Sequence, residues 1–346
     1  MFRTRLTAGL GLALLLFAGA ARADYLLYFE AQGVAGYSSE VRRPIYYSQN
    51  PDAEMQKPSV GFDYLQRIAG EKGDIATFAL QGRLALTENN PEGTDFGSRE
   101  NRHAYKGEFQ VYNAFVKVKT PLSYLWVGHN RPAFGLSSYF DSHGLILRTL
   151  AIQGFGYDRD WGAGLYRDFS WGDVSASLTT GTGMPLFVDG SLATEGNYMT
   201  AARISYGVQS QDNFNLGFSL GYGETMDTMG YQFRDPEPLA MRLAGVDLTI
   251  LRDNLEHRFD LYAGRWLDRD TVAVSYRFGI NLDAENRFKI EAQPTYWKFG
   301  EEYNYEAALC FSTLVTADLT ARLAYTYDHN RDDHRFLLQL YYYLPI

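Results

Sequence analysis

No stretch of this sequence beyond residue 23 approaches the roughly 20 consecutive apolar residues of a membrane-spanning helix, yet apolar residues recur at every second position. In DTVAVSYRFGINLD (270–283) the apolar positions are Val272, Val274, Tyr276, Phe278, Ile280 and Leu282. The positions between them are Thr271, Ala273, Ser275, Arg277, Gly279 and Asn281. A period of two indicates a β-strand whose two faces meet different surroundings. A run of about ten such residues also matches a strand that crosses a bilayer at a tilt.

The same alternation recurs along the whole chain. NFNLGFSLGYG (213–223) and LTARLAYTYD (319–328) carry aromatic residues at the ends of their apolar faces and small or charged residues on the other face. Aromatic residues at the ends of apolar strand faces are typical of the girdles of membrane barrels. The pattern predicts about sixteen strands, at 24–36, 58–69, 74–87, 107–119, 122–130, 159–169, 171–182, 197–208, 213–224, 239–251, 255–266, 270–282, 286–298, 303–314, 318–328 and 334–344.

The predicted connections alternate between short and long. Short turns such as 70–73 and 252–256 are interleaved with longer connections, and three modest ones follow near the C-terminus. The longer connections are 37–57, 88–106, 131–158, 183–196 and 225–238. The number of strands is even, and connections after odd-numbered and even-numbered strands differ in length. This pattern predicts an all-β, transmembrane antiparallel β-barrel of about 16 strands, with long extracellular loops and short periplasmic turns. A water-soluble β-sandwich has no reason to keep that parity and would expose its aromatic faces.

Residues 1–23 have the three-part layout of a secretory signal peptide. Arg3 and Arg5 precede an apolar core at 10–17, and small residues lead to a predicted cleavage after Ala23. We therefore expect 24–346 to form the barrel, in the outer membrane of a Gram-negative bacterium.

Charge and cysteine content exclude several classes of function. The formal net charge is −9, and loss of the three signal-peptide arginines leaves about −12, a poor match to nucleic acid. Cys310 is the sole cysteine, so no internal disulfide forms and no zinc-binding spacing exists. We predict no metal site and no cofactor.

A barrel of about sixteen strands is wide enough to leave an aqueous channel, and the chain has no length to spare for a plug domain. The sequence therefore predicts a porin for passive diffusion of small hydrophilic solutes or ions, not an enzyme. On the predicted inner faces of the second half, a basic strip could run down one wall and set ion selectivity. Its candidates are Arg258, Arg277, Arg287 and Arg322. The alternative is that these charges pair with interleaved acids and only keep the lumen wet.

The third and longest connection, 131–158, is the candidate constriction loop. Its apolar stretch LILRTLAIQGFG (145–156) could pack against the inner wall. Its charged and titratable candidates for the narrow point are Arg131, Asp141, His143 and Arg148. The alternative is a surface loop that stays outside the lumen.

Two stretches resemble a known family. They are KGEFQVYNAFVKVKTPLSYLWVGHNRPAFGLSSYF (106–140) and YDRDWGAGLYRDFSWGDVSASLTTGTG (157–183). They are similar to the phosphate-selective porin O/P group in the positions Val127, Gly128, Pro132, Phe134, Gly135, Arg159, Asp160, Thr182 and Gly183. The resemblance implies a sixteen-stranded outer-membrane channel whose third loop folds inward. It does not extend to phosphate specificity, because that loop lacks lysine, and the C-terminal YYYLPI also departs from the usual terminal aromatic.

Three other readings stay open. Asp141, Ser142 and His143 include the residue types of a catalytic triad, but adjacent residues cannot aim at one another as a nucleophile and its base must. An interaction barrel, for example a sheath around periplasmic electron-transfer proteins, would have a similar sequence. A homotrimer embedded in outer-membrane lipid is also open, with its contact on an outer patch that lacks aromatic girdles.

Overall fold

The computed structural model describes residues 22–48, 56–70, 73–89, 104–138, 144–183, 193, 195–229 and 232–346. Nearly all of the predicted signal peptide lies outside these ranges. Among the described residues, no helix is long and apolar enough to cross a membrane. The strands are β1 (Arg22–Ser38), β2 (Arg43–Ile45), β3 (Ser59–Gly70), β4 (Gly73–Asn89), β5 (Ala104–Lys119), β6 (Tyr124–Asn130), β7 (Asp160–Phe169), β8 (Gly172–Thr179), β9 (Tyr198–Gly207), β10 (Asn213–Met229), β11 (Gln232–Arg252), β12 (Leu255–Trp266), β13 (Arg269–Asn281), β14 (Phe288–Phe299), β15 (Glu302–Leu314), β16 (Leu319–Asp328) and β17 (Asp333–Pro345).

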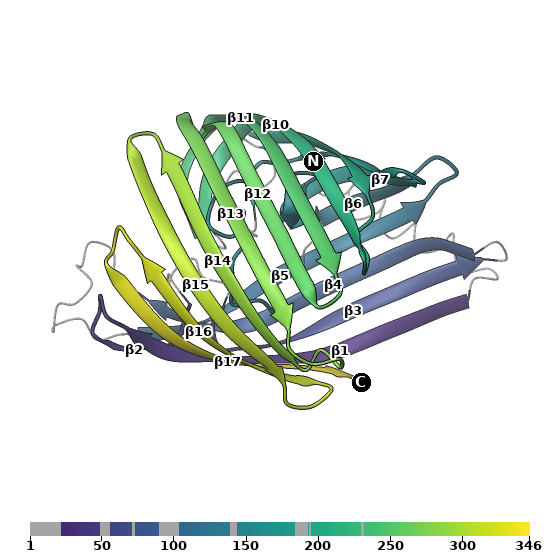
Figure 1. Ribbon diagram of the computed structural model, residues 1–346. Coiled ribbons are helices and arrows are strands. Elements are labelled where there is room, and N and C mark those ends of the chain that lie inside the picture. The colour runs from purple at the N-terminus through teal and green to yellow at the C-terminus, as the bar shows by residue number, and fades with distance from the viewer. Residues whose placement is uncertain are drawn as a thin grey trace.

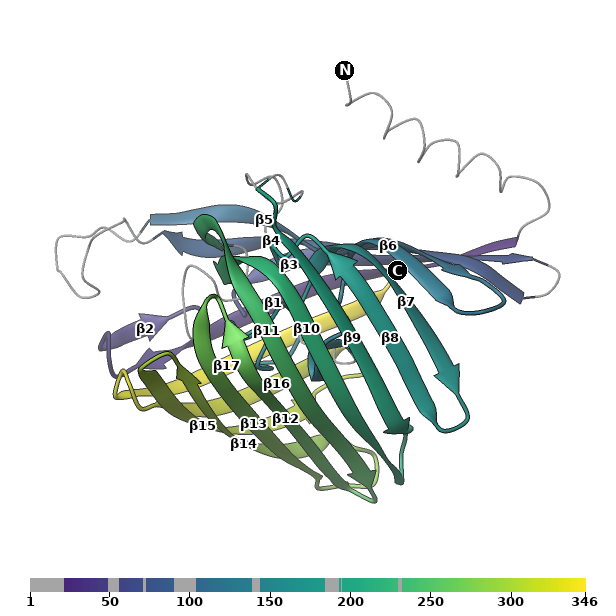
Figure 2. The same ribbon diagram turned by 90° about the horizontal axis from the view of Figure 1, so that it is seen from above.

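Sixteen long strands form one closed antiparallel barrel, as predicted from the sequence. Each pairs with its neighbours in chain order, and β1 closes the ring by pairing with β17, from Tyr28 opposite Pro345 to Ser38 opposite Arg335. Figure 1 shows this closure, where the yellow C-terminal strands lie beside the purple β1. The short β2 is an addition, since it pairs only with the end of β1 and occupies the place that β3 takes along the rest of that strand. Figure 2 shows β8 to β13 side by side as one wall.

The polar face of each strand is the inner face. On β13, Thr271 and Arg277 are buried, whereas Val272 and Tyr276 are 40% and 36% exposed. Exposed aromatic residues gather near both ends of the outer face, as in the girdles of membrane barrels. They include Tyr25, Tyr206, Phe214 and Phe288 near the short-turn end, and Tyr37, Tyr222, Tyr303 and Phe336 near the other end.

One predicted loop is a continuation of two strands. Residues 225–238 were expected to form a long connection, but β10 runs to Met229 and β11 begins at Gln232. The pairing is irregular there: Asp227 lies opposite Asp235, and Thr225 lies opposite Leu239. The two prolines of DPEP (235–238) fall at this bulge, where a residue without an N–H costs no ladder hydrogen bond. The strands therefore project past the apolar band, where alternation of apolar residues is no longer required.

Candidate functional site

The segment between β6 and β7, residues 131–158, turns into the barrel directly after β6. The amide of Ala133 donates to Ser177 Oγ on β8, and the amide of Gly135 donates to Ser219 Oγ on β10, each at 3.0 Å. Both serines are buried on the inner face of the wall. Their short side chains let the backbone of the segment lie close to the wall. We call the described residues of this connection, 131–138 and 144–158, the inner segment.

Gly135 is required at this entry. Its φ is +61°, in the left-handed region that favours glycine, and a Cβ at this position would collide with the hydroxyl of Tyr262. Tyr262 is fully buried and donates to Asp260 Oδ2 at 2.7 Å, so it has little room to move.

A first apolar anchor holds the inner segment against β9, β11 and β12. Its buried members are Phe134, Leu150, Phe155 and Tyr157 from the segment, with Met199, Met241, Leu243, Tyr262 and Trp266 from the wall. The Tyr157 hydroxyl is within hydrogen-bond distance of two backbone oxygens, those of Gly181 (2.8 Å) and Met226 (2.5 Å). Burial raises the pKa of Tyr157 well above its ordinary value, so the phenol keeps its proton.

A second apolar anchor lies farther along the inner wall, on β15 to β17. Ile146 and Leu147 of the inner segment join a buried cluster with Ile45, Tyr47, Cys310, Ala324 and Leu337. Together, the two anchors hold the segment along the inner wall, from β9–β12 to β15–β17.

Three side chains of the wall bind backbone oxygens of the inner segment. Arg277 Nη2 donates to the carbonyl of Leu147, and Gln293 Nε2 donates to the carbonyl of Arg148, each at 2.8 Å. Arg322 Nη1 donates to the carbonyl of Gly144 at 2.8 Å. We call Arg277, Gln293 and Arg322 the carbonyl clamps. Hydrogen bonds from a buried cation to a carbonyl are among the stronger ones, so these contacts fix the path of the segment.

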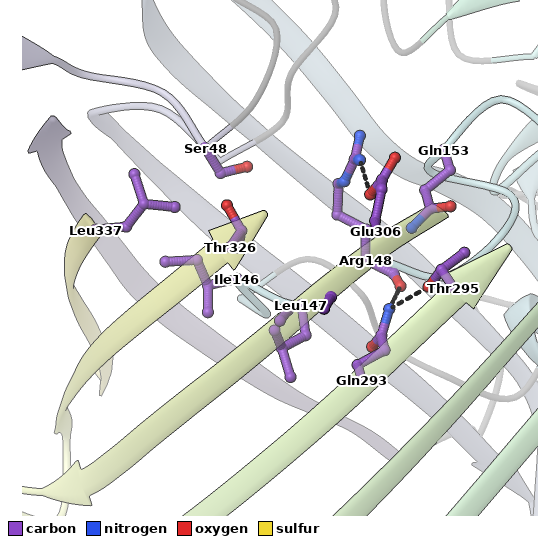
Figure 3. Close-up of a pocket in the computed structure, with 12 residues that line it drawn as sticks. Ser48, Ile146, Leu147, Arg148, Gln153, Gln293, Thr295, Glu306, Thr326 and Leu337 are labelled. Atoms are coloured by element: carbon purple, nitrogen blue, oxygen red, sulfur yellow. Dashed lines mark hydrogen bonds and ion pairs between the residues drawn. The ribbon is translucent and has the colours of Figure 1, made fainter. Parts of the chain in front are cut away.

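Arg148 points from the inner segment to β15. Its Nη2 lies 3.2 Å from Glu306 Oε2, and both side chains are largely buried, at 12% and 14% exposed. Figure 3 shows this pair and the bond from Gln293 to the Arg148 carbonyl. A cavity of about 20 Å³ beside the pair is bordered by Thr295 and Ser48, which is room for a single water.

Two predicted strip arginines, Arg258 and Arg277, lie opposite each other on β12 and β13. Acidic side chains lie between the cations of this part of the wall. Arg258 pairs with Glu256, and Lys289 Nζ bridges Glu256 Oε2 (2.7 Å) and Glu291 Oε1 (3.0 Å). The strip is thus an interleaved cluster of both signs. Glu256 was missed from the sequence although its parity with Arg258 places it on the same inner face.

The other predicted residues have different surroundings. Arg287 belongs to the turn before β14, where it is half exposed and pairs with Asp283 (3.2 Å) and Glu285 (2.9 Å), so it is not part of the wall. The sequence pattern placed Arg287 on the inner face because the alternation of inward and outward residues was extended to position 287, one residue before β14 begins. Arg131 is half-buried at the start of the inner segment. Asp141 and His143 lie outside the described residues.

A second basic group lies inside the barrel at the short-turn end. Lys117 and Lys119 share the inner face of β5, with their Nζ atoms 5.5 and 5.7 Å from the ring centre of Tyr124. They border a hollow of about 380 Å³ together with Arg67 and Asp74. We call Arg67, Lys117 and Lys119 the mouth cations. Arg67 and Lys119 are exposed.

The motif residues that follow the inner segment have structural partners. Arg159 stacks on Tyr112 with 4.5 Å from its guanidinium carbon to the ring centre, and its Nε donates to Asn113 Oδ1 at 3.0 Å. The Asp160 carboxylate accepts the amides of Gly181 (2.7 Å) and Gly183 (3.1 Å). The Asp160 contacts join the end of the inner segment to the β8 exit, and the Arg159 contacts join it to β5.

Comparison with known proteins identifies the fold. No protein-family model matches the chain and no curated protein matches it, so the resemblance to phosphate-selective porins is not confirmed. Solved structures do match. OmpF of Salmonella typhi has a TM-score of 0.62 at 11% identity, over 94% of this chain and 98% of that chain. The anion-selective porin of Comamonas acidovorans has a TM-score of 0.57 at 9% identity, over 94% and 100%. OmpT of Vibrio cholerae, in its trimer form, has a TM-score of 0.57 at 10% identity, over 94% and 99%. The chain thus has the fold of the outer-membrane porins, a closed transmembrane barrel of sixteen antiparallel strands.

Proposed function

We propose that this protein is a porin of the Gram-negative outer membrane, which forms a water-filled channel for passive diffusion of small hydrophilic solutes or ions. The observation that carries the proposal is a sixteen-stranded closed barrel with an apolar outer face and a polar, charged inner face. A barrel of this size is wide enough for an aqueous lumen, and such a division of faces suits lipid outside and water inside. A diffusion channel needs no catalytic residue and no cofactor.

Within this channel we assign the inner segment the role of constriction. Its anchors and the carbonyl clamps hold it inside the barrel, so solutes have to pass beside it. Arg148 and Glu306 are a cation and an anion where the inner segment meets β15, and such charges influence which ions pass. Arg131, Asp141 and His143 complete the set of candidates for the narrow point.

Conductance of the purified protein in planar bilayers tests both assignments. We expect discrete single-channel steps, and a reversal potential under a KCl gradient that shifts toward cation preference in Arg148→Ala and Arg131→Ala. Absence of conductance from correctly folded protein would contradict the channel. Normal conductance with unchanged reversal potentials in both variants would contradict only the constriction.

The inner segment also weighs against the alternative of a sheath barrel. A sheath has to admit a partner protein, such as a periplasmic electron-transfer protein, into its lumen. Here the lumen holds the protein's own segment, with Leu150 fully buried against the wall. Co-purification of a haem protein in stoichiometric amount would favour the sheath.

A homotrimer is the assembly we propose, because one matching structure is described as a trimer form. Light scattering of the detergent-solubilised protein, corrected for bound detergent, would give a mass of three chains. A mass of one chain would contradict the trimer without affecting the channel.

A further inference from the structure

The outer face of β11 marks both edges of the apolar band. Its outward positions run Arg242, Ala244, Val246, Leu248, Ile250 and Arg252. Ten residues of strand cover about 34 Å, and a tilt of about 45° reduces this to about 24 Å across the membrane. That span matches the about 25 Å apolar band of outer-membrane barrels. Arg242 and Arg252 therefore lie at the two membrane surfaces, with Arg242 on the side of the long connections.

Arg242 lies in a basic and aromatic row across four strands. Its neighbours in register are Tyr222 on β10 and Arg265 on β12, and Thr200 follows on β9. The guanidinium carbon of Arg242 is 5.8 Å from the centre of the Tyr222 ring. Arg265 pairs with Asp268 at 3.1 Å, whereas Arg242 has no carboxylate partner in the part of the chain that the structure describes.

The next row toward the middle of the membrane consists of alanines, except for Leu220. Across five neighbouring strands, from β8 to β12, it runs Ala176, Ala202, Leu220, Ala244 and Ala263. The row after that is bulky, with Val174, Ile204, Phe218, Val246 and Leu261. Small residues between two larger rows leave a groove on the outer face. Its volume is about 740 Å³, and Arg242 and Tyr222 are among the residues that line it.

We propose that this groove binds a phosphate-bearing lipid of the surrounding leaflet. The lipid phosphate lies against Arg242 and Arg265, and part of an acyl chain fills the groove over the alanine floor. Arg242 and Arg265 lie directly opposite each other on neighbouring strands, and Asp268 pairs only with Arg265, so an anion at Arg242 lowers the repulsion between the two. A guanidinium forks onto phosphate oxygens, and the Tyr222 ring holds that of Arg242 in place.

A lipid fits this surface better than a free anion or a second copy of the chain. A free phosphate would use the arginines but leave the apolar groove unfilled. A second copy would have to bring an acid to Arg242 at the membrane surface, whereas lipid supplies phosphates at that depth. The net charge of the protein is −9, so the protein as a whole does not attract an anionic lipid. Any electrostatic attraction has to come from local basic groups such as Arg242.

Native mass spectrometry of the full protein in neutral detergent tests the proposal. The probes are phosphatidic acid and a diacylglycerol with the same acyl chains, titrated against wild type, Arg242→Gln, Ala244→Phe and Arg252→Gln. We expect Arg242→Gln to weaken phosphatidic acid binding about tenfold, the loss of one charge-assisted pair, and to leave diacylglycerol binding unchanged. Ala244→Phe should weaken binding of both lipids because it fills the groove. Arg252→Gln, at the opposite membrane surface, is the matched control and should weaken neither.

Several results would overturn the proposal. Phosphatidic acid binding that is equal in Arg242→Gln and wild type would do so, and so would complete displacement by millimolar inorganic phosphate, which would indicate a free-anion site. Loss of an oligomer in Ala244→Phe with lipid binding per chain unchanged would assign the groove to a subunit contact. Thermal unfolding of each variant checks its fold, and none of these measurements depends on channel activity.

Discussion

Basic residues occur on two parts of the inner wall, and their surroundings differ. Arg277 and Arg322 are deep in the barrel and donate to carbonyl oxygens of the inner segment. The mouth cations on β3 and β5 border a hollow, where Arg67 and Lys119 are exposed and contact rings or solvent. A guanidinium whose N–H groups donate to backbone carbonyls stabilises the position of that backbone. In the proposed channel, an exposed cation instead interacts with passing ions. Position on the inner face does not by itself say which of the two roles an arginine has.

The largest effect should come from Gly135, where the inner segment enters the barrel. We expect Gly135→Ala to lower the free energy of unfolding by about 3–5 kcal/mol, because strained backbone and a collision with buried Tyr262 add together. Denaturant titration in detergent measures this loss. Gly196→Ala is the matched control, since Gly196 also has positive φ (+83°) but open space around it, and should lose only about 1–2 kcal/mol. Equal losses would show that the contact with Tyr262 does not matter.

Removal of a carbonyl clamp should have the next largest effect. Arg277→Met leaves the Leu147 carbonyl and Gln293 Oε1 without their donor, and leaves Glu291 with one nearby cation fewer. We expect a loss of about 2–4 kcal/mol, together with noisier and larger single-channel currents as the inner segment loosens. Lys117→Met, on the exposed wall, should leave the current noise at the wild-type level. Quiet currents of wild-type size from Arg277→Met would indicate that the anchors alone position the segment.

The mouth cations should affect selectivity and not stability. Replacement of Arg67, Lys117 and Lys119 by glutamine should shift the reversal potential toward cations, while the free energy of unfolding changes by less than about 0.5 kcal/mol. The shift should shrink in 1 M salt, where the screening length falls to about 3 Å. Asp74→Asn, in the same hollow, should shift the potential in the opposite direction. A salt-independent shift would argue against an electrostatic cause.

The smallest effect should come from Arg287. Hydrogen bonding from the Phe288 amide is the largest cause that lowers the pKa of Asp283, and Arg287 contributes further to that lowering. Arg287→Ala should therefore raise the pKa of Asp283 only partway to its ordinary value, and leave the reversal potential unchanged. Carboxyl chemical shifts, followed by NMR during acid titration, measure the pKa of Asp283. Recordings in planar bilayers measure the reversal potential. A changed reversal potential would place Arg287 on the ion path after all.

The strands were predictable because each strand residue within the membrane faces either lipid or the lumen. Apolar and polar residues therefore have to alternate there. All sixteen predicted spans correspond to strands, including 24–36 and 159–169, whose alternation is weak. The rule ends where the membrane ends. Residues 225–238 were therefore expected to form a loop although they continue two strands, and Arg287 was assigned to a wall that stops at Phe288.

The inner segment was predictable only in outline. Its apolar stretch 145–156 suggested packing, but neither the two anchors nor the partner of Arg148 follows from local pattern. Glu306 is 158 residues away in the chain, and which inward residues meet depends on how the barrel curves. The carbonyl clamps could not be predicted for the same reason. The sequence pattern around an inward arginine is the same whether its side chain binds a carbonyl or faces water.

The long sequence separation of these contacts has a consequence for assembly. The polar partners of residues 144–148 come from β13 to β16, and the bond between Arg322 and Gly144 spans 178 residues. Contacts between such remote residues form late, because the chain between them has first to be brought to order. Those strands are the last to be synthesised, and the ring closes only when β17 meets β1. An unfinished barrel therefore has a wider bore than the mature one. In the proposed channel, settling of the inner segment is the step that both narrows the bore and braces the newly closed wall.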